Sequence, residues 1–109
     1  MSVQRIASVI RLREEKREEY LRLHADPWPE VMATLTRVGV RNYSIFLHGD
    51  LLFSYLEFHG ESWAQAQAEI ARDPHTQQWW TLTDPCQTPL QDALDGEWWS
   101  AMRPVFLLE

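Results

Sequence analysis

Two apolar runs joined by a short polar turn constrain the fold of this chain more than any other feature. The runs are Asn42 to Leu47, NYSIFL, and Leu51 to Phe58, LLFSYLEF, and His48 to Asp50 separates them. Aromatic and β-branched residues on both sides of a glycine-containing turn are typical of an antiparallel hairpin. The sequence therefore predicts two neighbouring strands in the middle of the chain.

Both faces of this predicted hairpin carry apolar side chains. In the first strand, residue alternation places Tyr43, Ile45 and Leu47 on one face, and Ser44 and Phe46 on the other. A chain of 109 residues can cover such a sheet with helices on only one side, so the second face needs a partner. The simplest partner is another copy of the chain, and we expect a homodimer.

The segment before the hairpin predicts one strand and two helices. Val3 to Leu12 is rich in β-branched residues and favours a strand. Strong helix formers from Arg13 onward, REEKREEYLRLH, predict a helix. Asp26 is a good N-cap and Pro27 a good first helical residue, so a second helix is expected to begin there and to end at Gly39.

The segment after the hairpin predicts more helix, a loop and a last strand. Glu61 to Arg72 reads as a helix, and Gln77 to Leu82 extends the helical region beyond Asp73-Pro74. A loop of about a dozen residues without periodic signal follows. Ala101 to Leu108 is expected to be the last strand, in which Pro104 requires an edge position or the first residue.

The order strand, helix, strand, strand, helix, strand is the ferredoxin-like βαββαβ pattern of the α+β class. It predicts one domain over residues 1–109, with an antiparallel sheet covered by helices on one face. Two such sheets packed together form a dimeric α+β barrel. This arrangement hosts many chemistries, so the function must be sought in individual residues.

Charge and cysteine content narrow the class of partner. The net charge of -6 argues against a nucleic-acid or anionic-membrane partner. No apolar run approaches the roughly 20 residues that a membrane-spanning helix needs, and the N-terminus lacks the apolar core of a signal peptide. The single cysteine, Cys86, cannot form an internal disulfide, so we expect a cytoplasmic protein, although a bacterial exported protein could also lack disulfides.

The stretch from Tyr20 to Trp28, YLRLHADPW, is the first place to look for chemistry. Tyr20 and His24 stand four residues apart on the predicted helix and therefore share a face. A histidine titrates near neutral pH and can serve as general acid and base. A purely structural role for both side chains is the alternative.

The tandem tryptophans Trp79 and Trp80 are the second candidate. On a helix they point about 100° apart, so one indole can seal the core while the other faces a cavity. An indole suits a sugar, whose ring has C–H faces, although both rings could also serve only in packing. A second pair, Trp98 and Trp99, is expected to anchor the preceding loop or a dimer contact.

Metal and nucleotide chemistry find little support in the sequence. The histidines His48, His59 and His75 form no metal-ligand spacing with one another. The chain has only 4 Gly and no glycine-rich phosphate loop. We therefore expect no dedicated metal site, and the common glycine-rich cradle for nucleotides is missing.

Five sequence blocks together resemble the L-rhamnose mutarotase family. They are EEYLRLHADPWPEV, RNYSIFL, LLFSYLEF, QQWW and PVFLL, and they follow in the same order over nearly the whole chain. The resemblance implies a dimeric α+β barrel that interconverts the α and β anomers of a deoxy-sugar without a cofactor. It implies that His24 is the proton donor and that Tyr20, Tyr43, Trp79 and Trp80 contact the monosaccharide.

Two departures from the family pattern leave the sugar open between L-rhamnose and L-fucose. The stretch AQAQAEIARDPHTQ is slightly longer than in the rhamnose enzymes, and the DGEWW segment is similar to relatives that act on L-fucose. Two other functions also remain open at this point. The same barrel serves small monooxygenases, and a dimeric sugar-binding module without activity would fit the same residues.

Overall fold

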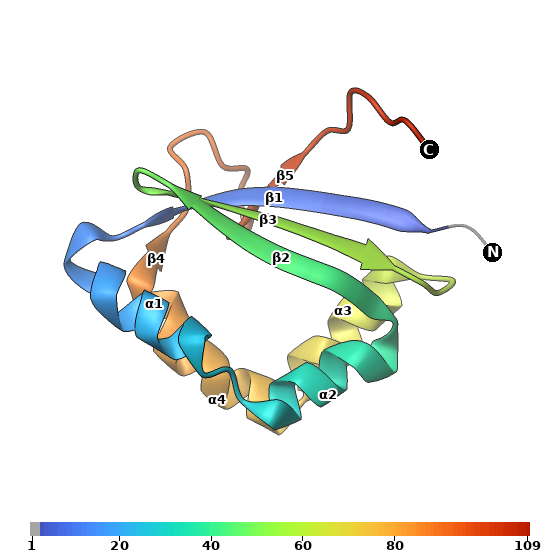
Figure 1. Ribbon diagram of the computed structural model, residues 1–109, viewed down its shortest axis with the longest axis horizontal. Helices are drawn as coiled ribbons and strands as arrows, with labels where there is room; N and C mark the ends of the chain where they lie inside the picture. The colour runs from blue at the N-terminus through green and yellow to red at the C-terminus, as the bar shows by residue number, and fades with distance from the viewer. Residues whose placement is uncertain (1–2) are drawn as a thin grey trace.

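The computed structural model describes residues 3–109 as a curled antiparallel sheet with helices on one side (Figure 1). The elements are, in chain order, β1 (Gln4–Leu12), the short 3₁₀ helix η1 (Glu14–Lys16), α1 (Arg17–Ala25), α2 (Pro29–Val38), β2 (Val40–His48), β3 (Leu51–Phe58), α3 (Trp63–Arg72), α4 (Pro74–Thr83), the short 3₁₀ helix η2 (Asp84–Cys86), β4 (Gln87–Thr88) and β5 (Ser100–Met102). The predicted α+β, ferredoxin-like fold is confirmed.

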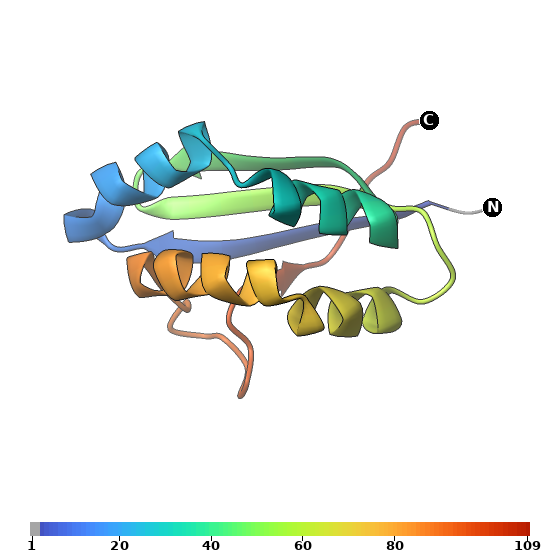
Figure 2. The same ribbon diagram turned by 90° about the horizontal axis from the view of Figure 1, so that it is seen from below.

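The sheet has the strand order β2-β3-β1-β4, and β5 also pairs with β1. All of these pairs are antiparallel. β2 and β3 form the predicted hairpin, with Leu47 opposite Leu52. Seen from below, α1 and α2 form one row of helices under the sheet, and α4 and α3 form a second row (Figure 2). None of the helices described here is long and apolar enough to cross a membrane.

The second helix begins at Pro29, so the prediction that Asp26 and Pro27 begin it was wrong. The backbone N–H of Asp26 instead bonds to the carbonyl of Leu23 and ends α1. A residue before a proline is pushed out of helical geometry, and Trp28, which precedes Pro29, is extended at φ -71°, ψ 126°. The helix can therefore start only at Pro29. It ends, as predicted, at Gly39, whose φ of 108° suits glycine.

The Asp73-Pro74 pair separates two helices. α3 begins at Trp63, two residues later than predicted, after the Ser62 hydroxyl caps the N–H of Gln65. Asp73 ends α3 and then caps α4, where its carboxylate accepts bonds from the N–H and the hydroxyl of Thr76. The region from 77 to 82 belongs to α4, as predicted.

The C-terminal strand is much shorter than the expected span from Ala101 to Leu108. β5 ends at Met102, and residues 103–109 are all exposed and belong to no strand. Pro104 lacks the N–H that would continue the pairing with β1, which explains the early end. The loop before β5 holds β4, which the sequence did not predict and which pairs with Arg11 and Leu12.

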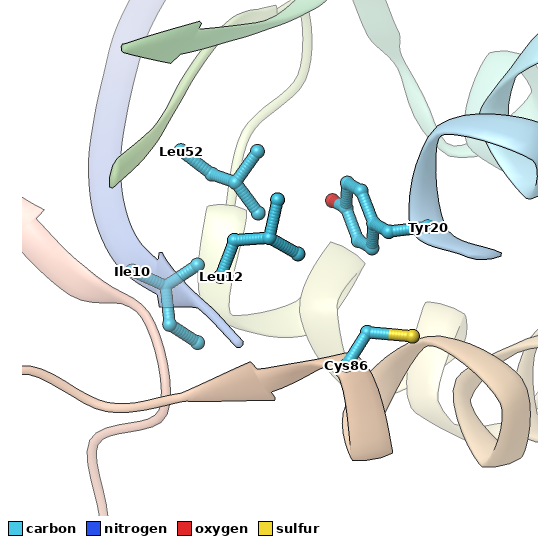
Figure 3. Packing of buried hydrophobic residues seen from close by; sticks show 5 residues of the cluster. All are labelled: Ile10, Leu12, Tyr20, Leu52 and Cys86. Carbon is cyan, nitrogen blue, oxygen red and sulfur yellow. The ribbon is translucent and has the colours of Figure 1, made fainter. Parts of the chain in front are cut away.

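The core lies between the sheet and the helices. One cluster joins Ile10, Leu12 and Leu52 from the sheet with Tyr20 and Cys86, and in Figure 3 the Tyr20 ring reaches from α1 toward Leu12. A second cluster lies under the other end of the sheet and comprises Val40, Leu56, Phe58, Ala66 and Ile70. Within residues 3–109, no helix lies on the opposite face of the sheet (Figure 1). Phe46 is on that face and is 65% exposed.

Candidate active site

Tyr20 and His24 lie against each other on α1. Their ring centroids are 4.1 Å apart and their planes differ by 28°, which is a stacked arrangement. Residues four apart on a helix project from one face, one turn from each other. The helix places the two rings together, as the sequence predicts.

A hydrogen bond sets the tautomer of His24. Its Nδ1 lies 3.0 Å from the backbone carbonyl oxygen of Tyr20. A carbonyl only accepts, so Nδ1 must carry the proton and donate it. In the neutral ring, Nε2 is then the nitrogen with a free lone pair. Burial lowers the pKa of His24, and the carbonyl bond offsets only part of that effect. At neutral pH the imidazole is therefore an uncharged base at Nε2.

Trp79 and Trp80 point to different surroundings. Trp79 is buried, and its ring meets His24 and Trp28 edge-on, at centroid distances of 5.4 Å and 5.2 Å. Trp80 is 38% exposed. One indole thus supports the histidine from the core while its neighbour remains accessible.

A bulge in β2 turns Tyr43 toward the helices. Arg41 pairs with Glu57 and Ser44 with Tyr55, so Asn42 and Tyr43 stand together opposite one residue of β3. Asn42 takes up the irregularity with a φ of 50°. The side-chain alternation shifts by one residue at this point, which puts Tyr43 on the face of Ile45 and Leu47, the residues that pack against the core.

The phenols of Tyr20 and Tyr43 are close enough to influence each other. Burial is the main cause of the raised pKa of Tyr20, and the negative charge of an ionised Tyr43 is the next largest. Burial of the hydroxyl also raises the pKa of Tyr43, although 43% of the whole residue is exposed. Both phenols are therefore protonated at neutral pH and can donate hydrogen bonds. The charge interaction between the two phenols indicates that these side chains of α1 and β2 lie near each other.

Gln87 is a site residue that the sequence did not point out. Its carboxamide donates to the Tyr20 hydroxyl at 3.3 Å and accepts from Trp98 Nε1 at 3.0 Å. The contact joins residues 67 positions apart, within a segment that has no periodic signal. No local pattern could have revealed it. Trp98 anchors the loop before β5 through this bond, which is one of the two roles expected for it.

An open groove of about 800 Å³ borders part of the site, but His24, Tyr20 and Tyr43 are not among its lining residues. Trp80, Trp98 and Gln87 form part of its wall. The other lining residues are Arg13, Glu15, Lys16, Gln77, Thr81, Asp84 and Pro85. Gln87 therefore has the groove on one side and Tyr20 on the other.

Three other titratable side chains do not belong to this site. Tyr55 and Glu57 bond to each other at 2.9 Å on the face of the sheet that the helices do not cover. Cys86 is fully buried, and burial raises its pKa, so it does not suit a nucleophile. Within residues 3–109, no group of three His, Cys, Asp or Glu side chains could hold a metal ion.

Several known proteins similar to this chain are named L-rhamnose mutarotase. A family model described as L-rhamnose mutarotase matches residues 5–108. The L-rhamnose mutarotase of Pectobacterium atrosepticum is 34% identical over 113 residues, covering 96% of this chain and 98% of that protein. The L-rhamnose mutarotase of Lactiplantibacillus plantarum is also 34% identical, over 90 residues that cover 81% and 84% of the two chains.

A solved structure supports the fold independently. The crystal structure of an L-rhamnose mutarotase from Formosa agariphila aligns with a TM-score of 0.76. The alignment covers 97% of this chain and 99% of that one, at 23% identity. The arrangement of helices and sheet is therefore shared along nearly the entire length of both chains.

Proposed function

The chain belongs to the L-rhamnose mutarotase family, and from this premise we propose that it is an isomerase that interconverts the α and β anomers of L-rhamnose. The observation that carries the proposal is the fixed tautomer of His24, with a free Nε2 on the same helix face as the Tyr20 phenol. The relatives described above are named for L-rhamnose, which favours this sugar over L-fucose.

Mutarotation requires only proton transfers. The proton leaves the anomeric hydroxyl O1, the bond between C1 and the ring oxygen O5 breaks, and O5 gains a proton, which yields the open aldehyde. Rotation about the C1–C2 bond presents the other carbonyl face to O5, and the reverse steps close the ring. The atoms balance without an oxidant, a reductant or a cofactor.

We propose that His24 carries the proton in both directions. Nε2 starts as a free base, accepts the proton from O1 and becomes an imidazolium. It then donates that proton to O5, which is bonded to the same carbon and thus lies close by. The bond from Nδ1 to the Tyr20 carbonyl holds the ring in one orientation throughout. The proton-donor role expected for His24 is the second half of this cycle.

The tyrosines and tryptophans have complementary roles in this proposal. Tyr20 and Tyr43 remain protonated, because burial raises both pKa values, and they donate hydrogen bonds to the sugar hydroxyls. Trp80 presents an exposed indole face to the C–H surface of the sugar. Trp79 lines the pocket behind the imidazole, where it contacts His24 edge-on.

We also propose that the enzyme is a homodimer whose two sheets pack face to face as an α+β barrel. The uncovered face of the sheet, which includes Phe46, supports this proposal. So does the segment 103–108, called here the C-terminal arm, which leaves the protomer after β5 (Figure 1). Val105, Phe106 and Leu108 in this arm are each more than 80% exposed. A second copy would bury both surfaces.

The function is tested by measuring anomer exchange on a panel of L-sugars. Saturation of the H1 resonance of one anomer transfers to the other at the rate of interconversion. We expect the enzyme to accelerate exchange of L-rhamnose much more than that of L-fucose. Acceleration of L-fucose alone would contradict the proposed substrate, and acceleration of neither sugar would contradict the proposed activity.

A further inference from the structure

The strongest additional feature of the molecule is the bridge that Gln87 makes between Tyr20 and Trp98. Gln87 lies in β4 opposite Leu12 and is only 3% exposed. Its side-chain amide contacts the Tyr20 hydroxyl on one side and the Trp98 indole nitrogen on the other. A buried amide with a partner at each end has little freedom to move.

The chemistry of Trp98 decides which way the Gln87 amide points. An indole N–H only donates, so the atom that faces it must be the amide oxygen, at 3.0 Å. The amide nitrogen is then directed toward the Tyr20 hydroxyl, 3.3 Å away. Tyr20 therefore accepts a hydrogen bond from Gln87. Without Trp98 the amide could turn over and accept from the phenol instead.

The direction of this bond matters for the phenol. A tyrosine hydroxyl has one proton to donate, and a neighbour that only donates to it leaves that proton available. Burial raises the pKa of Tyr20, so the proton is retained at neutral pH. An acceptor at position 87 would instead compete with the sugar for the same proton.

We propose that Gln87, oriented by Trp98, is a positioning residue that keeps the Tyr20 hydroxyl free to donate a hydrogen bond to the sugar. This inference rests on the proposed function, and it adds two residues that make no assigned contact with substrate. It also assigns different roles to Trp98 and its neighbour Trp99. Trp98 orients Gln87, whereas Trp99 packs against the core cluster of Ile10 and Leu12.

Substitution of Gln87 by Glu is the sharpest test, because the shape is kept while the amide donor becomes an acceptor. The carboxylate then accepts from Tyr20, and we expect KM for L-rhamnose to rise by about tenfold with kcat within about twofold, as for one lost hydrogen bond. Gln87→Met removes both bonds at similar length but leaves the phenol proton uncontested, so KM should rise by less than in Gln87→Glu. A merely structural role would lower the active fraction, and therefore kcat, without changing KM.

The second tryptophan pair, Trp98 and Trp99, provides a matched control. Trp98→Phe removes the N–H that orients Gln87 and should raise KM by about threefold, since the ring packing is largely kept. Trp99→Phe should leave KM unchanged. In the Tyr20→Phe background, Gln87→Glu should have no further effect on KM, because its action passes through the missing hydroxyl. Additive effects of these two changes would overturn the inference.

Nuclear magnetic resonance separates failure of this inference from failure of the proposed function. The Trp98 indole N–H resonance, assigned by its loss in Trp98→Phe, should move upfield in Gln87→Met and stay in place in Trp99→Phe. An unmoved resonance would show that the bridge does not exist, whatever the activity. An unchanged KM for L-rhamnose in an active Gln87→Glu enzyme would also overturn the inference. A wild-type protein without anomer exchange would instead refute the proposed function, and this inference with it.

Discussion

The imidazole of His24 is held by the residue one turn before it, Tyr20, through both its ring and its backbone. The ring centroids are 4.1 Å apart, and Nδ1 lies 3.0 Å from the Tyr20 carbonyl oxygen. The two contacts act on the face and the edge of the ring, so neither rotation nor exchange of tautomers is easy. The free nitrogen, Nε2, is consequently held in a defined direction before substrate binds.

The lowered pKa of His24 predicts how stability depends on pH. The unfolded chain binds a proton at this residue below about pH 6.5, whereas the folded chain does so only at lower pH. Between the folded and unfolded pKa values the unfolded state holds more protons, so the free energy of unfolding should decrease as pH falls through this window. Urea titrations at pH 7.5 and 5.5 should show a larger decrease for wild type than for His24→Gln. Equal decreases would contradict the burial of a neutral imidazole.

The phenol hydroxyls should contribute to sugar binding more than to folding. Tyr20→Phe and Tyr43→Phe retain the rings, so each should change the free energy of unfolding by only about 1 kcal/mol. Each should raise KM for L-rhamnose by about tenfold if one hydrogen bond to the sugar is lost. Steady-state exchange rates at several sugar concentrations measure this, and an unchanged KM in either variant would exclude that tyrosine from the binding site.

Substitutions of Trp79 and Trp80 should have different effects on stability and on sugar binding. Trp79 is buried among His24 and Trp28, so Trp79→Ala should cost about 3–5 kcal/mol of unfolding free energy. Trp80 is 38% exposed, and Trp80→Ala should cost about 1 kcal/mol while weakening sugar binding. Denaturant unfolding together with a sugar titration distinguishes the two effects. Similar losses of stability in both variants would contradict the orientation described here.

The proposed dimer predicts that the C-terminal arm and the uncovered sheet face are both needed for assembly. Removal of residues 103–109, or Phe46→Asp on the open face, should shift the protein from dimer to monomer in analytical ultracentrifugation. Leu94→Asp is a suitable control, because Leu94 is also highly exposed but lies in the loop before β5. A wild-type protein that sediments as a monomer at micromolar concentration would refute the dimer.

Local patterns predict those parts of the fold whose cause is local. The hairpin of β2 and β3 follows from two apolar strands around a turn, and the stacking of Tyr20 on His24 follows from helical spacing. The different surroundings of Trp79, which is buried, and Trp80, which is partly exposed, follow from the angle between adjacent helical residues. In each case the interacting residues are close in sequence, so periodicity is sufficient.

Features that depend on contacts between residues far apart in sequence cannot be predicted from local patterns. The bulge at Asn42 shifts the side-chain alternation, so that Val40 and Tyr43 both face the core although they are three residues apart. It depends on the pairing with β3 and has no signal in the sequence of β2 itself. The Gln87 amide meets Tyr20 only because β4 pairs with β1. The expected long final strand ends at Met102 because Pro104 cannot continue the ladder within the same protomer.

The central claim is that the Nε2 atom of His24 carries the proton during exchange of L-rhamnose anomers. Saturation-transfer NMR on L-rhamnose, with wild type and His24→Gln at equal concentration and pH 7.5, tests it most directly. We expect wild type to accelerate exchange well above the spontaneous rate, and His24→Gln to lose at least about a hundredfold of that acceleration, the lower range for a general acid–base group. Exchange at the wild-type rate in a folded His24→Gln protein would contradict the claim.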